Sequence, residues 1–307
     1  MPAAGSGRQI CSAKMRNSIT CWMLLAALAG YSVSITNAGQ AVARPKVKQM
    51  NTTDFDRLFK TKDWTAVEIA QQSGVGIVPA IEPHLRDPDE VVRLLAVDCI
   101  AAAGGPRAPM LLLGALNDSN EQVRNNAVNA LHRHLPVGHE EALIAAWDAN
   151  RTRDAYVRQQ IPMILGLMHA QQRVEDLKIR LKGDPRQEVR DGIIAGASKL
   201  GDPQSRGVFG EMLKVARGKR TAVLIEFVKY LDEPWVIPLL VPALQRRDMA
   251  VDLSTHRHEV HRRDCDLAVD EVLRISKTQF SFPMNPMVQY REDQIAEVMR
   301  YAQTQHR

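Results

Sequence analysis

The chain has 307 residues, of which 45% are hydrophobic and 5% aromatic, and its formal net charge is +5. Three basic residues and no acidic residue fall within residues 1–43, so the remainder carries a net charge of only +2, and no basic run is interleaved with aromatic residues. This balance argues against a nucleic-acid-binding protein, and the excess of aliphatic over aromatic residues favours helices packed on helices.

Residues 1–43 have the pattern of a secretory signal peptide. Lys14 and Arg16 supply a basic start, and residues 21–35 form an apolar run. This run is shorter than the roughly 20 residues that a membrane-spanning helix needs. A short apolar segment behind a basic start is typical of a signal that directs export and is then removed.

Small residues near the end of this segment offer two cleavage positions, after Ala43 or after Ala38. Cleavage at either would give a periplasmic or secreted protein with no stable membrane span. Two alternatives stay open. Translation from Met15 would make residues 1–14 an extension, and an uncleaved signal would remain as an anchor.

The next segments are expected to lead into a repeat region. Residues 44–62 begin polar and basic, and we expect a flexible N-terminal segment there. Residues 64–72 have a helical pattern that would cover the first repeat. The repeat region itself is expected to span residues 63–276.

Three segments share one arrangement, in which an Asp is followed three residues later by Glu or Gln and six residues later by Arg. They begin at Asp87, Asp118 and Asp184 and end at Arg93, Arg124 and Arg190. An Asp followed by Glu or Gln at this distance is the pattern of a capping box at a helix start. Repetition of the arrangement along a chain indicates stacked structural repeats.

Apolar residues at helical spacing follow each arginine, and Arg158 begins a fourth such helix. A shorter apolar helix precedes each turn, so each unit reads as two helices joined by a turn. The expected core residues of the second helices are Val92, Ala96, Cys99, Ile100, Val123, Ala127, Ala130, Leu131, Val157, Ile161, Ile164, Leu165, Val189, Ile193, Ala197 and Leu200.

This pattern resembles the HEAT repeat, in the short HEAT-like form of phycobilisome lyases. The resemblance implies an all-α, right-handed solenoid of about six helix pairs. It also implies a ladder of ion pairs between the Asp and Arg residues of the turns. The ladder residues assigned by this resemblance are Asp87, Arg93, Asp118, Arg124, Arg158, Asp184 and Arg190.

The third unit departs from the pattern. Thr152 stands six residues before Arg158, where an Asp is expected, and Asp154 comes two places later. The ladder bond of this unit is therefore left open by the sequence.

Two further units are expected nearer the C-terminus. A fifth spans residues 202–232, and a sixth begins near Trp235. Residues 267–270 repeat the Leu-Ala-Val-Asp of residues 95–98, which places Cys265 where the first unit has Arg93. No strand is expected anywhere in the chain.

Residues 277–307 are expected to form a loop and a final capping helix. The prolines in residues 280–286 exclude a helix there, and Phe280 and Phe282 would anchor the loop against the last repeat. The alternative is that this apolar segment stays available to a partner.

One cluster contains metal-ligand residue types: His256, His258, His261 and Cys265. In a helix, His258, His261 and Cys265 would share one face, and histidine and cysteine are ligands that zinc prefers. The alternative interpretation is a solvated, charged connection. Cys99 and Cys265 fall in distant repeats, so each is expected to stay a free thiol.

These features predict an exported, non-catalytic scaffold that binds another protein, with no cofactor and no nucleic acid. The surface residues after each ladder arginine are the expected contacts, namely Asn125, Gln159 and Asp191. The alternative is a metal-binding protein or metal-dependent enzyme centred on His258, His261 and Cys265.

Overall fold

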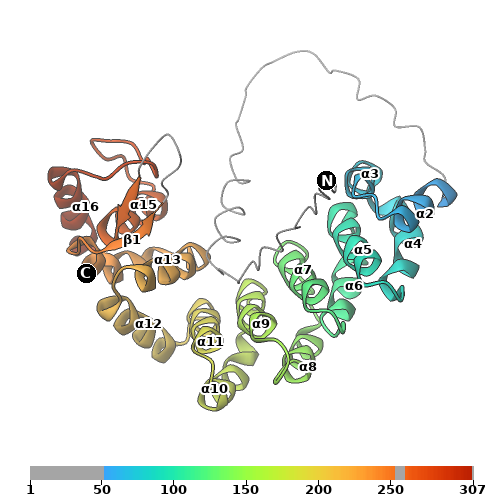
Figure 1. Ribbon diagram of the computed structural model, residues 1–307. Helices are drawn as coiled ribbons and strands as arrows, with labels where there is room; N and C mark the ends of the chain where they lie inside the picture. The colour runs from blue at the N-terminus through green and yellow to red at the C-terminus, as the bar shows by residue number, and fades with distance from the viewer. Residues whose placement is uncertain (1–51, 253–259, 306–307) are drawn as a thin grey trace, which may run out of the picture. The chain divides into compact units, whose positions relative to one another are not determined.

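A computed structural model describes residues 52–252 and 260–305, all within the unit Ala43–Arg307. Helices dominate these residues (Figure 1). In chain order the elements are α2 (Thr52–Thr61), α3 (Thr65–Ser73), η1 (Gly74–Ile77), α4 (Val78–Ile81), η2 (Glu82–Arg86), α5 (Glu90–Ala103), α6 (Ala108–Ala115), α7 (Glu121–Leu131), α8 (Glu140–Ala149), α9 (Ala155–Leu167), η3 (Gln171–Arg173), α10 (Val174–Gly183), α11 (Gln187–Lys199), α12 (Pro203–Val215), α13 (Lys219–Leu231), η4 (Pro234–Leu240), α14 (Val241–Leu244), β1 (Met249–Asp252), β2 (His261–Arg263), α15 (Asp264–Ser276) and α16 (Glu292–Thr304).

Successive helix pairs build the fold. The second helices α5, α7, α9, α11, α13 and α15 each contact the next in this order, and each packs on the first helix of its own pair. The six pairs run from α4–α5 to α14–α15 (Figure 1). A helix pair cannot bury its apolar surface alone, and stacking neighbours against one another buries these surfaces in a continuous core.

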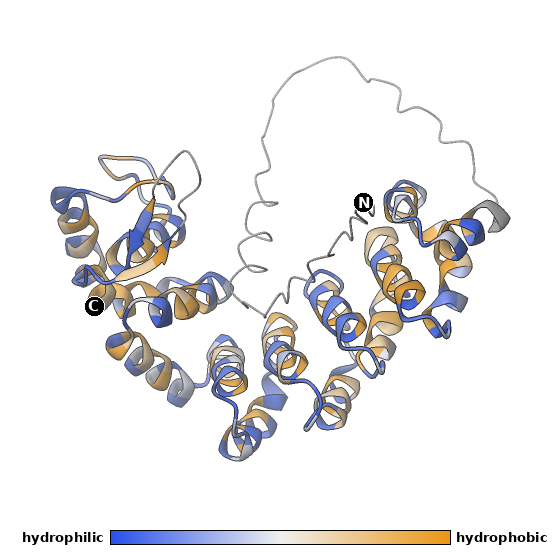
Figure 2. Cartoon of the chain, viewed as in Figure 1, coloured by the Kyte–Doolittle hydropathy of each residue, from blue (hydrophilic) through white to orange (hydrophobic). Residues whose placement is uncertain are grey.

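The apolar positions of the second helices lie in this core. All sixteen residues expected there are buried, and several are fully shielded from solvent. Figure 2 shows hydrophilic residues concentrated in the loops that join the helices. Burial of the apolar residues that recur at helical spacing therefore confirms the predicted class of fold.

The helix caps lie two residues later than the sequence predicted. Asp89 caps α5 by accepting a hydrogen bond from the Val91 amide at 2.9 Å, and Asn120 caps α7 by accepting from Gln122 and Val123. The side chain of Asp87 instead accepts from the Asp89 amide at 2.8 Å. Asp118 and Asp184 make the same local turn with Asn120 and Arg186. An Asp side chain that bonds its own turn in this way is not a helix cap.

The helices α9 and α11 approach each other through glycines. A side chain at Gly192 would overlap the backbone of Gln159, and one at Gly196 would overlap the backbone of Pro162. Pro162 has no amide hydrogen, so the carbonyl of Arg158 is free within α9, and the indole of Trp147 donates to it at 3.1 Å. Close backbone approach makes this the tightest junction between second helices.

Two expectations about the ends of the repeat region were wrong. Part of the segment expected to be flexible is the helix α2, because Phe55 and Phe59 are buried against the first repeat. Two short strands, β1 and β2, form an antiparallel hairpin before α15, although no strand was expected. The hairpin forms where the sixth pair has only a short first helix.

The helix α16 packs on α14, α15 and η4. Its buried residues are Ile295, Val298 and Ala302. It therefore covers the last repeat, as expected for a terminal cap. Within the described ranges, no helix combines the length and the apolar character that crossing a membrane requires.

Candidate functional site

Three arginines of second helices pair with the aspartate of the following repeat. Arg93 donates to Asp118 at 2.8 Å, and Arg124 donates to Asp154 at 2.9 Å. Arg158 pairs with Asp184 through a terminal nitrogen of its guanidinium. Asp154 thus supplies the bond that the sequence left open, and it also caps α9 through the amides of Tyr156 and Val157.

The ladder arginines also bind their own turns. Arg93 donates to the carbonyl oxygen of Asp87 at 2.8 Å, and Arg124 donates to that of Asp118 at 2.9 Å. Each guanidinium therefore joins two successive turns. Because a guanidinium presents several donors in a fixed plane, it sets the distance between the turns that it bridges.

The ladder ends at α11. Arg190 bonds the carbonyl oxygen of its own Asp184 and the side chain of Gln187, and it has no aspartate in the next repeat. The next two second helices are joined by an ion pair in which the arginine belongs to the later repeat and the aspartate to the earlier one. Arg220 of α13 donates to the buried Asp191 of α11 at 2.5 and 2.8 Å.

Burial shapes the electrostatics of these pairs. Burial alone would raise the pKa of Asp118, but hydrogen bonds from Arg93 and from the Asn120 amide outweigh it and lower the pKa below its usual value. Burial lowers the pKa of the Arg158 guanidinium, and the nearby cations Arg186 and Arg151 lower it further. The ladder charges are thus committed to structural partners within the stack.

The residues of the predicted metal cluster do not share a helical face. His261 lies in β2 with its ring exposed, and its Nδ1 is 3.4 Å from an Asp252 oxygen, whereas Cys265 is fully buried in α15. His256 and His258 lie outside the described residues. In the parts of the chain that the structure describes, no group of three or more His, Cys, Asp or Glu side chains is placed to hold a metal ion. A single helix through His261 and Cys265 does not form, because His261 lies in the strand β2 and α15 begins only after it.

Burial raises the pKa of the Cys265 thiol to about 11, and the neighbouring Asp266 adds to this shift. A thiol must lose its proton to become a good metal ligand or nucleophile. Cys265 is therefore a core residue in this arrangement. Cys99 is likewise buried and free.

A buried ionic cluster that sequence reasoning missed surrounds Cys265. Asp266 accepts from the amides of Arg263 and Tyr290 at 2.8 and 2.9 Å. Asp270 accepts from Arg262 and from the Tyr290 hydroxyl, each at 2.6 Å. These bonds tie the hairpin and the C-terminal loop to α15. Charged residues in the sequence marked the region, but the shared partner Tyr290 lies 24 residues after Asp266 and 20 residues after Asp270.

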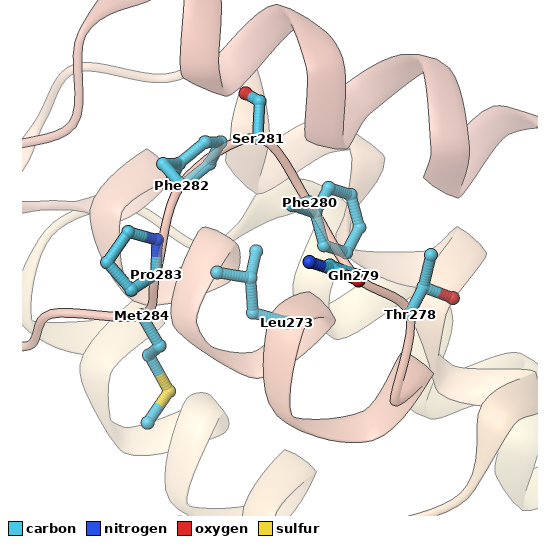
Figure 3. Close-up of a pocket in the computed structure, with 8 residues that line it drawn as sticks. All are labelled: Leu273, Thr278, Gln279, Phe280, Ser281, Phe282, Pro283 and Met284. Atoms are coloured by element: carbon cyan, nitrogen blue, oxygen red, sulfur yellow. The ribbon is translucent and has the colours of Figure 1, made fainter.

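The C-terminal loop between α15 and α16 forms an open pocket of about 460 Å³. Leu273 of α15 lies at its centre with Phe280, Phe282 and Met284 around it (Figure 3). Phe280 packs edge-on against Tyr301 of α16 at 5.4 Å. The loop therefore folds back onto the last repeat, and it also leaves apolar side chains at the surface. The exposed ones are Met284, Met287 and Val288.

A second apolar hollow opens between α10 and α12 and has a volume of about 280 Å³. Its floor is the buried Ile194 of α11, and its walls include Ile179 and Val208. Glu175, Lys178 and Lys182 of α10 contribute charged side chains to the lining.

The three residues expected to contact a partner do not form a common exposed surface. Gln159 and Asp191 are only 5% and 2% exposed, because α9 and α11 pack closely through the glycines. Asn125 is half-buried. Positions directly after the ladder arginines therefore face neighbouring helices, and that prediction was wrong for Gln159 and Asp191.

Helix pairs stacked in sequence order define an α-solenoid. Residues 78–161 match the protein family described as HEAT repeats. The fold is similar to a solved structure described as the complex of CpcE and CpcF of phycocyanin lyase from Nostoc sp. PCC7120. This similarity has a TM-score of 0.51 at 15% sequence identity, and it covers 88% of this chain and 99% of that chain. No curated protein sequence matches this chain significantly. The fold is that of a HEAT-repeat solenoid.

Proposed function

We propose that the protein is an exported, non-catalytic scaffold that binds another protein. The observation that carries this proposal is the apolar pocket of the C-terminal loop, with Met284 and Met287 exposed beside it. Apolar groups gathered at a surface are typical of protein-binding sites. Methionines adapt their shape to varied partners, which suits such a surface.

Two further points support binding rather than catalysis. The ladder and the C-terminal cluster engage their charged groups in structural ion pairs, so these groups are not available as acids, bases or metal ligands. The solved neighbour is described as a complex of two proteins, which is consistent with a solenoid that functions through a partner. Its description as a lyase concerns that complex.

Export is proposed from the sequence of residues 1–43 alone. We expect the protein in the periplasmic fraction or the medium, with a mature N-terminus at Arg44 or Gly39. Intact-mass measurement of the exported protein tests this directly. A full-length chain in the membrane fraction would instead indicate a retained anchor.

Binding is tested by photo-crosslinking in the native host. A photoreactive phenylalanine analogue replaces Met284, and the same analogue replaces Glu141, whose side chain is 90% exposed, as a matched control. We expect a discrete heavier adduct from position 284 and none from position 141. No adduct, or equal adducts at both positions, would contradict a binding site in the pocket.

A further inference from the structure

The groove between α10 and α12 exposes aliphatic side chains that the fold does not need at its surface. Ile179 is 68% exposed and Val208 is 40% exposed, while Ile194 below them is only 6% exposed. A single exposed aliphatic residue is ordinary. Two of them flanking a buried apolar floor form a hollow that a partner side chain can fill.

Three charged side chains of α10 line the groove, Glu175, Lys178 and Lys182, and one of them, Lys182, is an unpaired cation within the described part of the chain. Lys182 lines it, and no described carboxylate pairs with this side chain. Lys178 also lines it but is partnered by Glu175 at 3.0 Å and Asp202 at 3.6 Å. Lys182 is thus the free cation of the rim among the residues that the structure describes.

Exposed cations also occur in three successive turns between first and second helices. Arg151 lies between α8 and α9, Arg186 follows α10, and Lys219 begins α13. The carboxylates of the first two turns, Asp154 and Asp184, are buried in ladder bonds to Arg124 and Arg158, so they do not compensate the exposed charges. Arg186 has one acidic neighbour, Glu188, at 3.6 Å.

We propose that this groove and its basic border bind an acidic segment of a partner protein, anchored by an aliphatic or aromatic side chain between Ile179 and Val208. The proposal rests on the proposed scaffold function and adds to the C-terminal pocket a second binding surface, with the chemistry of its partner. Apolar contact supplies the anchor, and the complementary charges favour acidic partners and speed their encounter. An apolar hollow beside the cations favours a protein over a purely anionic surface.

The test uses a phage library of random peptides selected against the exported protein. We expect enriched peptides to be acidic and to carry a large apolar residue. Synthetic labelled copies should bind with an affinity that falls as salt rises. The double variant Ile179→Asp with Lys182→Glu should weaken binding about tenfold or more.

The matched control is Val137→Asp with Lys60→Glu. Val137 is 69% exposed, nearly the same as Ile179, and Lys60 is exposed in α2. This control should bind the peptides as the wild type does. Both variants change surface residues, so circular dichroism and the melting temperature should show that each remains folded.

Three outcomes would overturn the proposal. They are no enrichment, enrichment of peptides without acidic residues, or equal binding to both double variants. Binding to phosphatidylglycerol vesicles that needs Lys182, in the absence of peptide binding, would assign the surface to anionic lipid instead. Crosslinking at Met284 separates the two hypotheses. If an adduct forms at Met284 but the groove variant binds peptides as the wild type does, only the groove proposal is wrong. If there is no adduct and no effect of the groove variant, the proposed scaffold function is wrong as well.

Discussion

Arg124 donates through Nε to Asp154 at 2.9 Å and so joins the second helix of one repeat to the helix start of the next. Both side chains are almost fully buried, at 5% and 2% exposure. The same carboxylate caps α9 with its other oxygen. One aspartate thus performs two tasks that the preceding repeat divides between Asp118, which pairs with Arg93, and Asn120, which caps α7.

Removing this carboxylate should therefore destabilise more than removing its counterpart. Asp154→Ala leaves the guanidinium of Arg124 buried and unpaired, and a loss of about 3–5 kcal/mol is expected. Asp118→Ala should cost about 1–3 kcal/mol, because that pair is closer to solvent. Chemical denaturation of both variants measures the difference.

Asp154→Asn refines this prediction, since the amide oxygen can still cap α9. It should recover the part of the stability that comes from the cap, about 1 kcal/mol. Asp148→Ala serves as the control, because that carboxylate pairs with Arg180 at the surface and should contribute less than about 1 kcal/mol. Equal losses for Asp154→Ala and Asp148→Ala would contradict a structural role for the ladder.

The close junction of α9 and α11 makes a second prediction. In Gly196→Ala the added carbon would overlap the backbone of Pro162, so we expect a loss of about 1–3 kcal/mol. Gly207→Ala in α12 is the matched control, since nothing lies within 4 Å of the added carbon. There alanine should stabilise the helix by about 0.5–1 kcal/mol. Thermal unfolding distinguishes the opposite signs, and a neutral Gly196→Ala would contradict the close packing.

The sequence predicted the class of fold because its signals are local. Val92, Ala96 and Ile100 recur at helical spacing, and this spacing alone determines which helix face is buried. The cap positions were misassigned for a physical reason. Asp87 and Asp89 both suit the start of α5, and both accept from a backbone amide two residues later. Because the two aspartates have the same side-chain chemistry, the residue types alone do not show which of them is the cap.

The candidate binding surfaces were harder to predict. Ile179 and Ile194 are both isoleucines in helices, yet one is exposed and the other forms the floor of the groove. That difference depends on the angle between neighbouring helices, which the sequence pattern does not determine. The bond between Tyr290 and Asp270 likewise depends on a loop that folds back from outside the repeats.

His132 should make stability depend on pH. Its Nε2 lies 2.9 Å from Gln160 Oε1, and burial lowers its pKa below the ordinary value of 6.5, with a smaller contribution from Arg133. A base with a lowered pKa in the folded state is held neutral there, so the unfolded state binds more protons. The stabilisation is therefore present above about pH 6.5 and is lost as the pH falls through 6.5 toward the folded pKa.

This dependence is measured by comparing wild type with His132→Gln between about pH 7.5 and 5.5. Wild type should lose more free energy of unfolding over this interval than the variant, because all other titratable groups are shared. A lower starting stability of the variant does not affect the comparison of slopes. Parallel curves for the two proteins would contradict a His132 that is held neutral in the folded state.

The two described thiols should resist modification in the folded protein. Burial raises the pKa of Cys99 to about 12 and that of Cys265 to about 11, so little thiolate exists at neutral pH. A disulfide reagent should therefore react slowly with the native protein and rapidly with both thiols in denaturant. Zinc should leave the native rate unchanged. Rapid reaction of Cys265 that zinc suppresses, and that His261→Ala restores, would instead identify a metal site at the start of α15.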